Sequence, residues 1–172
     1  PFFGHVKEES FALAHNGVLW NDLELRHAKH LPRTKVQTDS YIAVQLLEQK
    51  KSLDFDSLRY MAEQVEGSFS FTVLDEQSAL WIVKGDSPLS IAYFPERGVY
   101  VYASTVEILN KALTRCGKQL GHRRTVEVEM GDLLKIDRRG HITRATFDAS
   151  KLCRPSWKYW SSSLYAEPPK TE

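Results

Sequence analysis

The sequence predicts an α+β fold that is built mainly from antiparallel sheet. Apolar residues follow a helical period in some segments and a period of two in others, and tight-turn residues join consecutive strand segments. The segments occur in the order strands, two helices, four strands, one helix and further strands. Such grouping of helices and strands indicates packed layers and not alternating βαβ units. The 172 residues are enough to bury a core, and we expect them to form one main domain.

The first predicted strands lie near the amino end. Residues 1–4, Pro-Phe-Phe-Gly, have the composition of the inside of a strand, so we expect the polypeptide to extend before Pro1. Residues 11–19 are rich in strand-forming side chains on both sides of Asn16-Gly17. Asn-Gly is a strong hairpin signal because both residues tolerate the positive φ of a type I′ turn. The local sequence therefore predicts a turn at residues 16–17, unless the amide and the backbone N–H there serve a substrate.

Helices are predicted where capping residues precede an apolar stripe. Asn21-Asp22 can cap a short helix, and Thr38-Asp39-Ser40 can cap a second one that reaches about residue 49. The second of the two longer helices starts from Asp54 or Asp56. Its apolar residues recur at helical spacing, which makes it the clearest helix in the chain: Leu58, Met61, Ala62 and Val65.

A period of two predicts the central strands. Residues 68–73 alternate as a half-buried strand does, whereas residues 80–83 are apolar on both faces and should be covered on both sides. Residues 89–94 and 99–102 flank the turn residues 95–98 and should form a hairpin.

One more helix and further strands follow. A helix from about Thr105 should turn three apolar side chains inward: Val106, Leu109 and Leu113. Residues 126–130 then alternate as a strand does, and residues 133–136 should pair with residues 141–147 across a turn.

Composition and charge are those of an ordinary globular protein. Hydrophobic residues make up 42% of the chain and charged residues 26%, and the formal net charge is +1. This balance gives no electrostatic case for nucleic acid or a membrane as a partner. No apolar run approaches the roughly 18 residues of a membrane span, and no secretory signal is visible, so we expect a cytoplasmic protein.

The residues with metal-binding or redox chemistry are few. Cys116 and Cys153 are too isolated for a disulfide framework or a metal knuckle and fit a reducing compartment, although the sequence leaves open whether they pair. His27 and His30 could share a metal ion, but no third ligand lies nearby, and an exposed helix face explains them more simply. We expect neither a metal nor an organic cofactor.

Six short motifs occur in a fixed order along the chain. They are Gly4-His5-Val6-Lys7, Ala14-His15-Asn16-Gly17, Thr38-Asp39-Ser40, Gly67-Ser68-Phe69-Ser70-Phe71, Gly85-Asp86-Ser87-Pro88-Leu89 and Ala103-Ser104-Thr105. Their joint order and spacing resemble the glutaminase domain of the class II glutamine amidotransferases, which are N-terminal-nucleophile hydrolases. The resemblance covers roughly residues 3–137.

This resemblance implies a four-layer αββα sandwich of mainly antiparallel sheets. It also implies hydrolysis of the side-chain amide of glutamine to glutamate and ammonia, with an N-terminal cysteine as the nucleophile. In the family the ammonia usually passes to a synthetase domain in the same polypeptide or complex. Glutamine and such an ammonia-accepting domain or subunit are therefore the expected partners.

The resemblance also assigns roles to four residues. It implies that the side-chain amide of Asn16 and the N–H of Gly17 form the oxyanion hole, and donors of this kind contribute roughly 10²–10³ in rate each. It implies that the carboxylate of Asp39 holds the α-ammonium of glutamine. Lys7 stands where the family has an arginine for the α-carboxylate, and a lysine keeps the charge but lacks the planar fork.

The sequence departs from the family in several places. No cysteine stands at or near residue 1, so we expect the nucleophile to lie upstream of Pro1. Only residues 8–14 separate Lys7 from the His-Asn-Gly motif, where the family has a longer loop, and Thr105 stands in place of a usual glutamate. The alternative is a catalytically inactive module of the same fold that binds an amino acid or a partner.

Two regions divide the chain by composition. We expect residues 1–150 to form the glutaminase-like domain and residues 151–172 to form an aromatic shoulder with a carboxy-terminal tail or linker. The shoulder carries Trp157, Tyr159 and Trp160, which should pack onto the surface of the domain.

Overall fold

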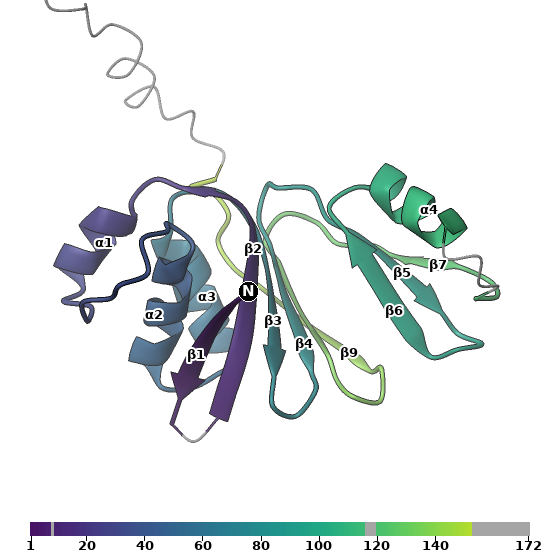
Figure 1. The fold of residues 1–172 in the computed structure, drawn as a ribbon, viewed down its shortest axis with the longest axis horizontal. Helices are drawn as coiled ribbons and strands as arrows, with labels where there is room; N and C mark the ends of the chain where they lie inside the picture. Colours follow the sequence, from purple (N-terminus) through teal and green to yellow (C-terminus); the bar gives the residue numbers. More distant parts are fainter. Residues whose placement is uncertain (8, 116–119, 153–172) are drawn as a thin grey trace, which may run out of the picture.

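Four layers make up the fold, in the order helices, six-stranded sheet, three-stranded sheet and helix (Figure 1). The computed structural model describes residues 1–7, 9–115 and 120–152. The helices are α1 (Asp22–Ala28), α2 (Tyr41–Lys50), α3 (Phe55–Gln64) and α4 (Val106–Arg115). The strands are β1 (Phe2–Val6), β2 (Glu9–Leu19), β3 (Gly67–Asp75), β4 (Leu80–Lys84), β5 (Ser90–Phe94), β6 (Val99–Ala103), β7 (Arg124–Val126), β8 (Asp132–Ile136) and β9 (Ile142–Thr146). The predicted α+β class and the αββα sandwich are confirmed.

The larger sheet is antiparallel throughout and has the strand order β1-β2-β3-β4-β8-β9. Helices α2 and α3 cover one of its faces and bury the main core between helix and sheet (Figure 1). Alternate strand residues face these helices because successive side chains point to opposite faces. They include Phe11, Leu13, Phe71, Val73 and Val83, and the helices supply Ile42, Leu46, Leu58 and Met61.

The smaller sheet, with the order β6-β5-β7, packs on the other face of the larger one. Ile91 of β5 meets Ile82, Leu134 and Ile136 of the larger sheet in a second apolar cluster. Helix α4 covers the outer side of the smaller sheet, where Leu109 is 1% exposed. The two sheets therefore lie between two helical layers.

The predicted turn at Asn16-Gly17 is wrong. Strand β2 runs straight through both residues and pairs with β3 from Phe11↔Asp75 to Leu19↔Gly67. The long partner strand overrides the local preference, and the glycine serves a different purpose. Gly17 has φ 143°, and a Cβ there would lie 1.8 Å from the carbonyl oxygen of Ser68. Only glycine allows β2 and β3 to approach this closely.

Of the other predicted elements, several are confirmed and three differ in detail. Helices α2 and α3, the hairpin β5–β6 and the pair β8–β9 form where they are expected. Strand β3 is buried on both faces and not half-buried, because Ser70 and Thr72 are also covered. Val106 is 51% exposed, since it precedes the turn of α4 that packs on the sheet. The alternating segment at 126–130 contributes only its first residue to β7.

Several expectations fall outside the described residues: Cys116, Cys153 and the aromatic shoulder at 157–160. Within the described part of the chain, no helix combines the length and the apolar character that crossing a membrane requires.

Candidate active site

The end of β2 projects past its neighbour β1. Pairing between β1 and β2 stops at Phe2↔Leu13, whereas β3 accompanies β2 as far as Leu19. Among the described residues, the edge of β2 after Leu13 therefore has no strand beside it. An open edge presents backbone N–H and C=O groups to whatever lies there.

The backbone N–H groups of β2 alternate between its two edges. The N–H of Trp20 donates to the carbonyl of Glu66 at 2.8 Å, which continues the β2–β3 register. The N–H groups of even-numbered residues in this part of β2 therefore point to β3. The N–H groups of odd-numbered residues point to the open edge. Leu19 is an example, since its N–H donates to Oδ2 of Asp39 at 2.6 Å. By the same alternation, the N–H of Gly17 points to the edge on which the Asp39 carboxylate lies.

Asn16 is exposed and lies on the face of the sheet that looks away from α2 and α3. Its Nδ2 donates to the carbonyl oxygen of Pro88 at 3.4 Å. A primary amide nitrogen carries two N–H groups, so this bond engages one of them. The contact fixes the direction of the side chain at the end of β2.

The loop between β4 and β5 is itself tied to β3. The hydroxyl of Ser70 donates to the carbonyl of Ser87 at 2.6 Å, and the hydroxyls of Ser68 and Ser87 lie 2.8 Å apart. The N–H of Phe69 donates to Oδ1 of Asp86 at 2.9 Å. The Gly-Asp-Ser-Pro motif thus holds the Pro88 carbonyl against β2, where it positions the amide of Asn16.

Asp39 lies directly before Ser40, the N-cap residue of α2, but its side chain reaches to β2 and does not cap the helix. Its Oδ1 accepts from the hydroxyls of Thr38 at 3.1 Å and Ser40 at 3.3 Å. Burial raises the pKa of Asp39, but hydrogen bonds from Leu19, Thr38 and Ser40 and the nearby His15 outweigh it, so the pKa is lowered. The carboxylate is ionised at neutral pH and, with four lone-pair sites, can accept a further donor.

His15 joins the same network from the helix-covered face of β2. Its Nδ1 lies 2.8 Å from the hydroxyl of Ser40, and its ring stacks on Phe71 with centroids 4.6 Å apart. Burial lowers the pKa of His15, while the charge of Asp39 and the carbonyl of Ser68 act in the opposite direction. The contact between His15 and Ser40 was not predicted from the sequence. The signal that could have indicated it is the assignment of both motifs, at residues 15–17 and 38–40, to one site.

The structure does not bring Lys7 to these residues. Lys7 lies in the turn between β1 and β2 with φ 50°, next to the pair Val6↔Glu9. The strand from there to Asn16 spans about 23 Å, at about 3.3 Å per residue. The direction of the β1–β2 hairpin carries residue 7 away from residue 16.

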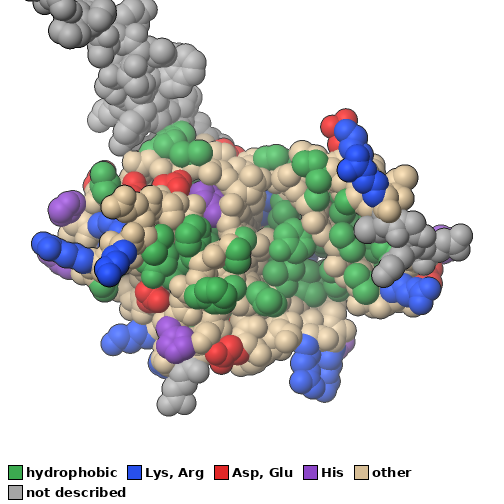
Figure 2. Space-filling model, in the orientation of Figure 1, with side chains coloured by type: hydrophobic (Ala, Val, Ile, Leu, Met, Phe, Trp, Pro, Cys, Tyr) green, Lys and Arg blue, Asp and Glu red, His purple; other side chains and the backbone are tan. Residues whose placement is uncertain are grey.

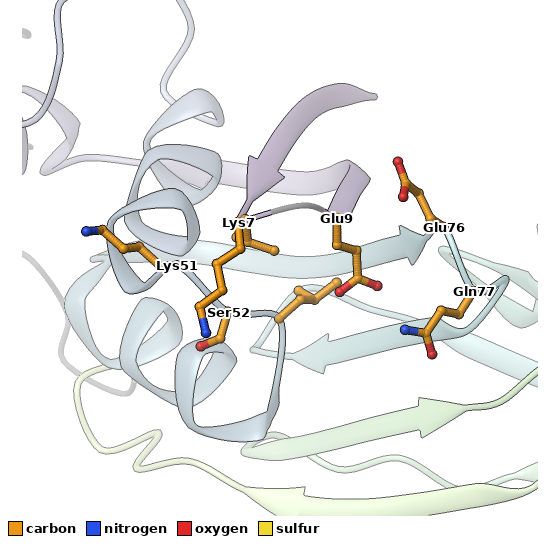
Figure 3. A pocket seen from close by; sticks show the side chains of 8 residues that line it. Lys7, Glu9, Lys51, Ser52, Glu76 and Gln77 are labelled. Carbon is orange, nitrogen blue, oxygen red and sulfur yellow. The ribbon is translucent and has the colours of Figure 1, made fainter.

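Lys7 instead lines a pocket of about 430 Å³ at the far end of the sheet (Figure 3). The pocket is also lined by Glu9, Lys51, Ser52, Glu76 and Gln77, together with Val6 and Leu53. Figure 3 shows the Lys7 side chain extended towards Ser52, while Lys51 points away from the pocket.

The two histidines considered as metal ligands lie at the α1 end of the molecule. His27 and His30 line a pocket of about 500 Å³ together with Arg26 and Arg33. Figure 2 shows Lys, Arg and His side chains gathered at this end. Among residues 1–7, 9–115 and 120–152, no three His, Cys, Asp or Glu side chains come together as a metal site would require.

Comparison with known proteins adds sequence and structural relatives. Residues 1–111 match the family model of a glutamine amidotransferase domain. The 7-cyano-7-deazaguanine synthase of Saccharolobus solfataricus is 32% identical over 95 residues, which cover 54% of this chain and 19% of that protein. The isomerizing glutamine–fructose-6-phosphate aminotransferase of Streptococcus agalactiae is 33% identical over 90 residues, 47% of this chain and 15% of that protein. The chain thus spans about a fifth or less of these curated relatives.

Solved structures support the fold. The allosteric regulatory enzyme of purine biosynthesis matches with a TM-score of 0.66 and 24% identity, over 86% of this chain and 30% of that one. The glutamine phosphoribosylpyrophosphate amidotransferase from B. subtilis, in complex with ADP and GMP, gives the same TM-score and identity and is covered to 31%. At this identity the likeness establishes the shared architecture alone.

Proposed function

Since residues 1–111 match its model, the chain belongs to the glutamine amidotransferase domain family, and we propose that it hydrolyses the side-chain amide of glutamine. Asn16 and Gly17 donate hydrogen bonds to the oxyanion, and Asp39 holds the α-ammonium group of the substrate. Lys7 is not part of this proposal, because it lies at the other end of β2.

The observation that carries the proposal is the shared edge of β2. Leu19 and Gly17 are two residues apart on the edge that β1 leaves open, so their N–H groups are separated by about 7 Å. Leu19 marks the position of the Asp39 carboxylate by donating to it. In extended glutamine, the α-nitrogen and the side-chain carbonyl oxygen are about 6 Å apart, given bond lengths of about 1.5 Å. One substrate can therefore reach Asp39 and the Gly17 N–H together.

The chemistry requires a nucleophile in addition to these groups. We propose an N-terminal cysteine that precedes residue 1, as in the family. Its thiolate would attack the amide carbon, and the carbonyl oxygen would take up negative charge beside Asn16 and Gly17. Ammonia would leave with a proton supplied by the α-amine of that cysteine. Water would then cleave the thioester and release glutamate.

The fate of the ammonia is part of the proposal. The curated relatives are named as a synthase and an aminotransferase, and this chain corresponds to a small part of each. We propose that the ammonia passes to an acceptor-binding domain or subunit, which the described residues do not include.

An activity measurement tests the proposal. The complete polypeptide that contains these residues should release glutamate from L-glutamine. Asn16→Ala should lower kcat by roughly 10²–10³ and leave KM nearly unchanged, because the lost donor acts on the oxyanion. Asn110→Ala, at an exposed asparagine on α4, is the matched control and should keep full activity. Absence of glutamate release would favour an inactive module that only binds, and equal activity of both variants would contradict the role of Asn16.

A further inference from the structure

A series of hydrogen-bonded side chains leads from His15 on β2 to Asp39 before α2. Nδ1 of His15 lies 2.8 Å from Oγ of Ser40, and this hydroxyl lies 3.3 Å from Oδ1 of Asp39. We infer that His15 is a positioning residue, which orients the Asp39 carboxylate through Ser40 for the α-ammonium of glutamine. The inference rests on the proposed function.

The hydrogen bonds in this series can all run in one direction, with His15 donating to Ser40 and Ser40 donating to Asp39. A serine hydroxyl has one proton, so when Ser40 donates it to Asp39, the Ser40 oxygen can only accept a hydrogen bond from His15. The histidine then carries its proton on Nδ1. Its Nε2 makes no hydrogen bond to the described residues and is buried, which fits the unprotonated nitrogen of this tautomer. We assign the tautomer from this network.

The environment of His15 holds the ring in place. The imidazole stacks on Phe71 with an interplanar angle of 28° and lies beside Gly17, where a Cβ would come within 2.9 Å of Nε2. His15 is half-buried, and its Nε2 is buried without a hydrogen-bond partner among the described residues, which destabilises the fold relative to an apolar side chain at this position. The retained polar contact is the one to Ser40.

Two other donors hold the carboxylate, and they explain what His15 adds. The Leu19 N–H binds Oδ2 and the Thr38 hydroxyl binds Oδ1, so Asp39 keeps its place without Ser40. The Ser40 hydroxyl fixes the rotation of the carboxylate and thus the direction of its free lone pair. Loss of this bond should weaken binding of the substrate ammonium and leave the oxyanion donors as they are.

Steady-state kinetics of the complete polypeptide test the inference. Ser40→Ala and His15→Phe should each raise KM for glutamine about tenfold, as expected for weakening one hydrogen bond to a charged group, and change kcat less than twofold. Phenylalanine keeps the stacking on Phe71 but not the donor. The double variant should raise KM no further than either single one, because both act through the same contact. His15→Asn, which keeps a donor near the Nδ1 position, should restore KM to within about threefold.

A matched pair elsewhere in the chain provides the control. His5 and Ser10 also form a hydrogen bond of 2.8 Å, but they are exposed and lie near the β1–β2 turn. His5→Phe and Ser10→Ala should leave both constants unchanged. Thermal unfolding of each variant shows whether the fold persists, and Ser40→Ala decides the matter if His15→Phe does not fold.

Asp39→Asn distinguishes a failure of the inference from a failure of the proposed function. If Asp39→Asn raises KM but His15→Phe and Ser40→Ala leave it unchanged, the inference is overturned and the proposed function stands. Multiplying effects in the double variant would also overturn it. If Asp39→Asn itself leaves KM unchanged, the role proposed for Asp39 fails, and the inference fails with it.

Discussion

The backbone N–H of Leu19 donates a 2.6 Å hydrogen bond to Oδ2 of Asp39. This contact joins the last residue of β2 to the residue before the N-cap of α2. It fixes a carboxylate on the strand edge towards which the Gly17 N–H points. The negative charge and the backbone donor therefore keep a set separation.

Asp39→Asn should weaken glutamine binding. Asparagine can still accept from the Leu19 N–H but carries no charge for the substrate ammonium. Since a hydrogen bond to a charged group contributes about 1.5–3 kcal/mol, KM should rise by about 10- to 100-fold, with a much smaller change in kcat. Steady-state glutamate release measures both constants. Glu127→Gln removes a charge from an exposed position and should change neither, and equal constants for the two variants would contradict the role of Asp39.

Gly17→Ala should disrupt the junction of β2 and β3. The added Cβ would meet the Ser68 carbonyl oxygen at 1.8 Å, and φ 143° is unfavourable for alanine. We expect the free energy of unfolding to fall by more than about 2 kcal/mol, as measured by urea denaturation. Gly98→Ala is the control, because its φ is also positive at 60° but no atom lies within 4 Å of the added Cβ. A similar cost at both positions would show that the close approach of the strands is unimportant.

Asp54 should stabilise α3 in a pH-dependent manner. Its Oδ1 accepts from the N–H of Ser57 at 2.8 Å. Burial raises the pKa of Asp54, but bonds from Ser57 and Ser52 outweigh it and hold the pKa below its ordinary value of 3.8. A carboxyl with a lowered pKa in the folded state contributes stability above its unfolded pKa, and this contribution is lost as the pH falls through the folded value.

Asp54→Ala should therefore cost about 1 kcal/mol at pH 7, the usual effect of removing an N-cap side chain. This difference in the free energy of unfolding should become smaller when the pH falls below the ordinary pKa of the carboxyl group. Urea unfolding at neutral and acidic pH measures it, with Asp56→Ala as a control because the Asp56 side chain is 86% exposed and pairs with Arg59 on the same helix. A cost that does not depend on pH would refute the capping interaction.

The sequence predicted the elements whose pattern is set locally. Helix α3 illustrates this, because its apolar spacing and the Asp54 cap are both visible within a few residues. Strand β4 is another case, since a segment that is apolar on both faces must be covered on both sides, as it is. Such features need no knowledge of distant partners.

Structure and sequence-based expectation differ where a distant segment decides the outcome. Asn16-Gly17 has the sequence of a turn, but β3 pairs with it along the whole strand. Lys7 was placed by motif order, whereas the hairpin direction decides its position. The link between His15 and Ser40 joins residues 25 positions apart, and only the packing of α2 against the sheet brings them together.

A crystal structure of the complete polypeptide with bound L-glutamate would test the central claim most directly. We predict one side-chain carboxylate oxygen within about 3.2 Å of both Asn16 Nδ2 and the Gly17 nitrogen, and the α-ammonium within the same distance of the Asp39 carboxylate. Glutamate bound at another place, or bound with its side chain turned away from residues 16 and 17, would contradict the account.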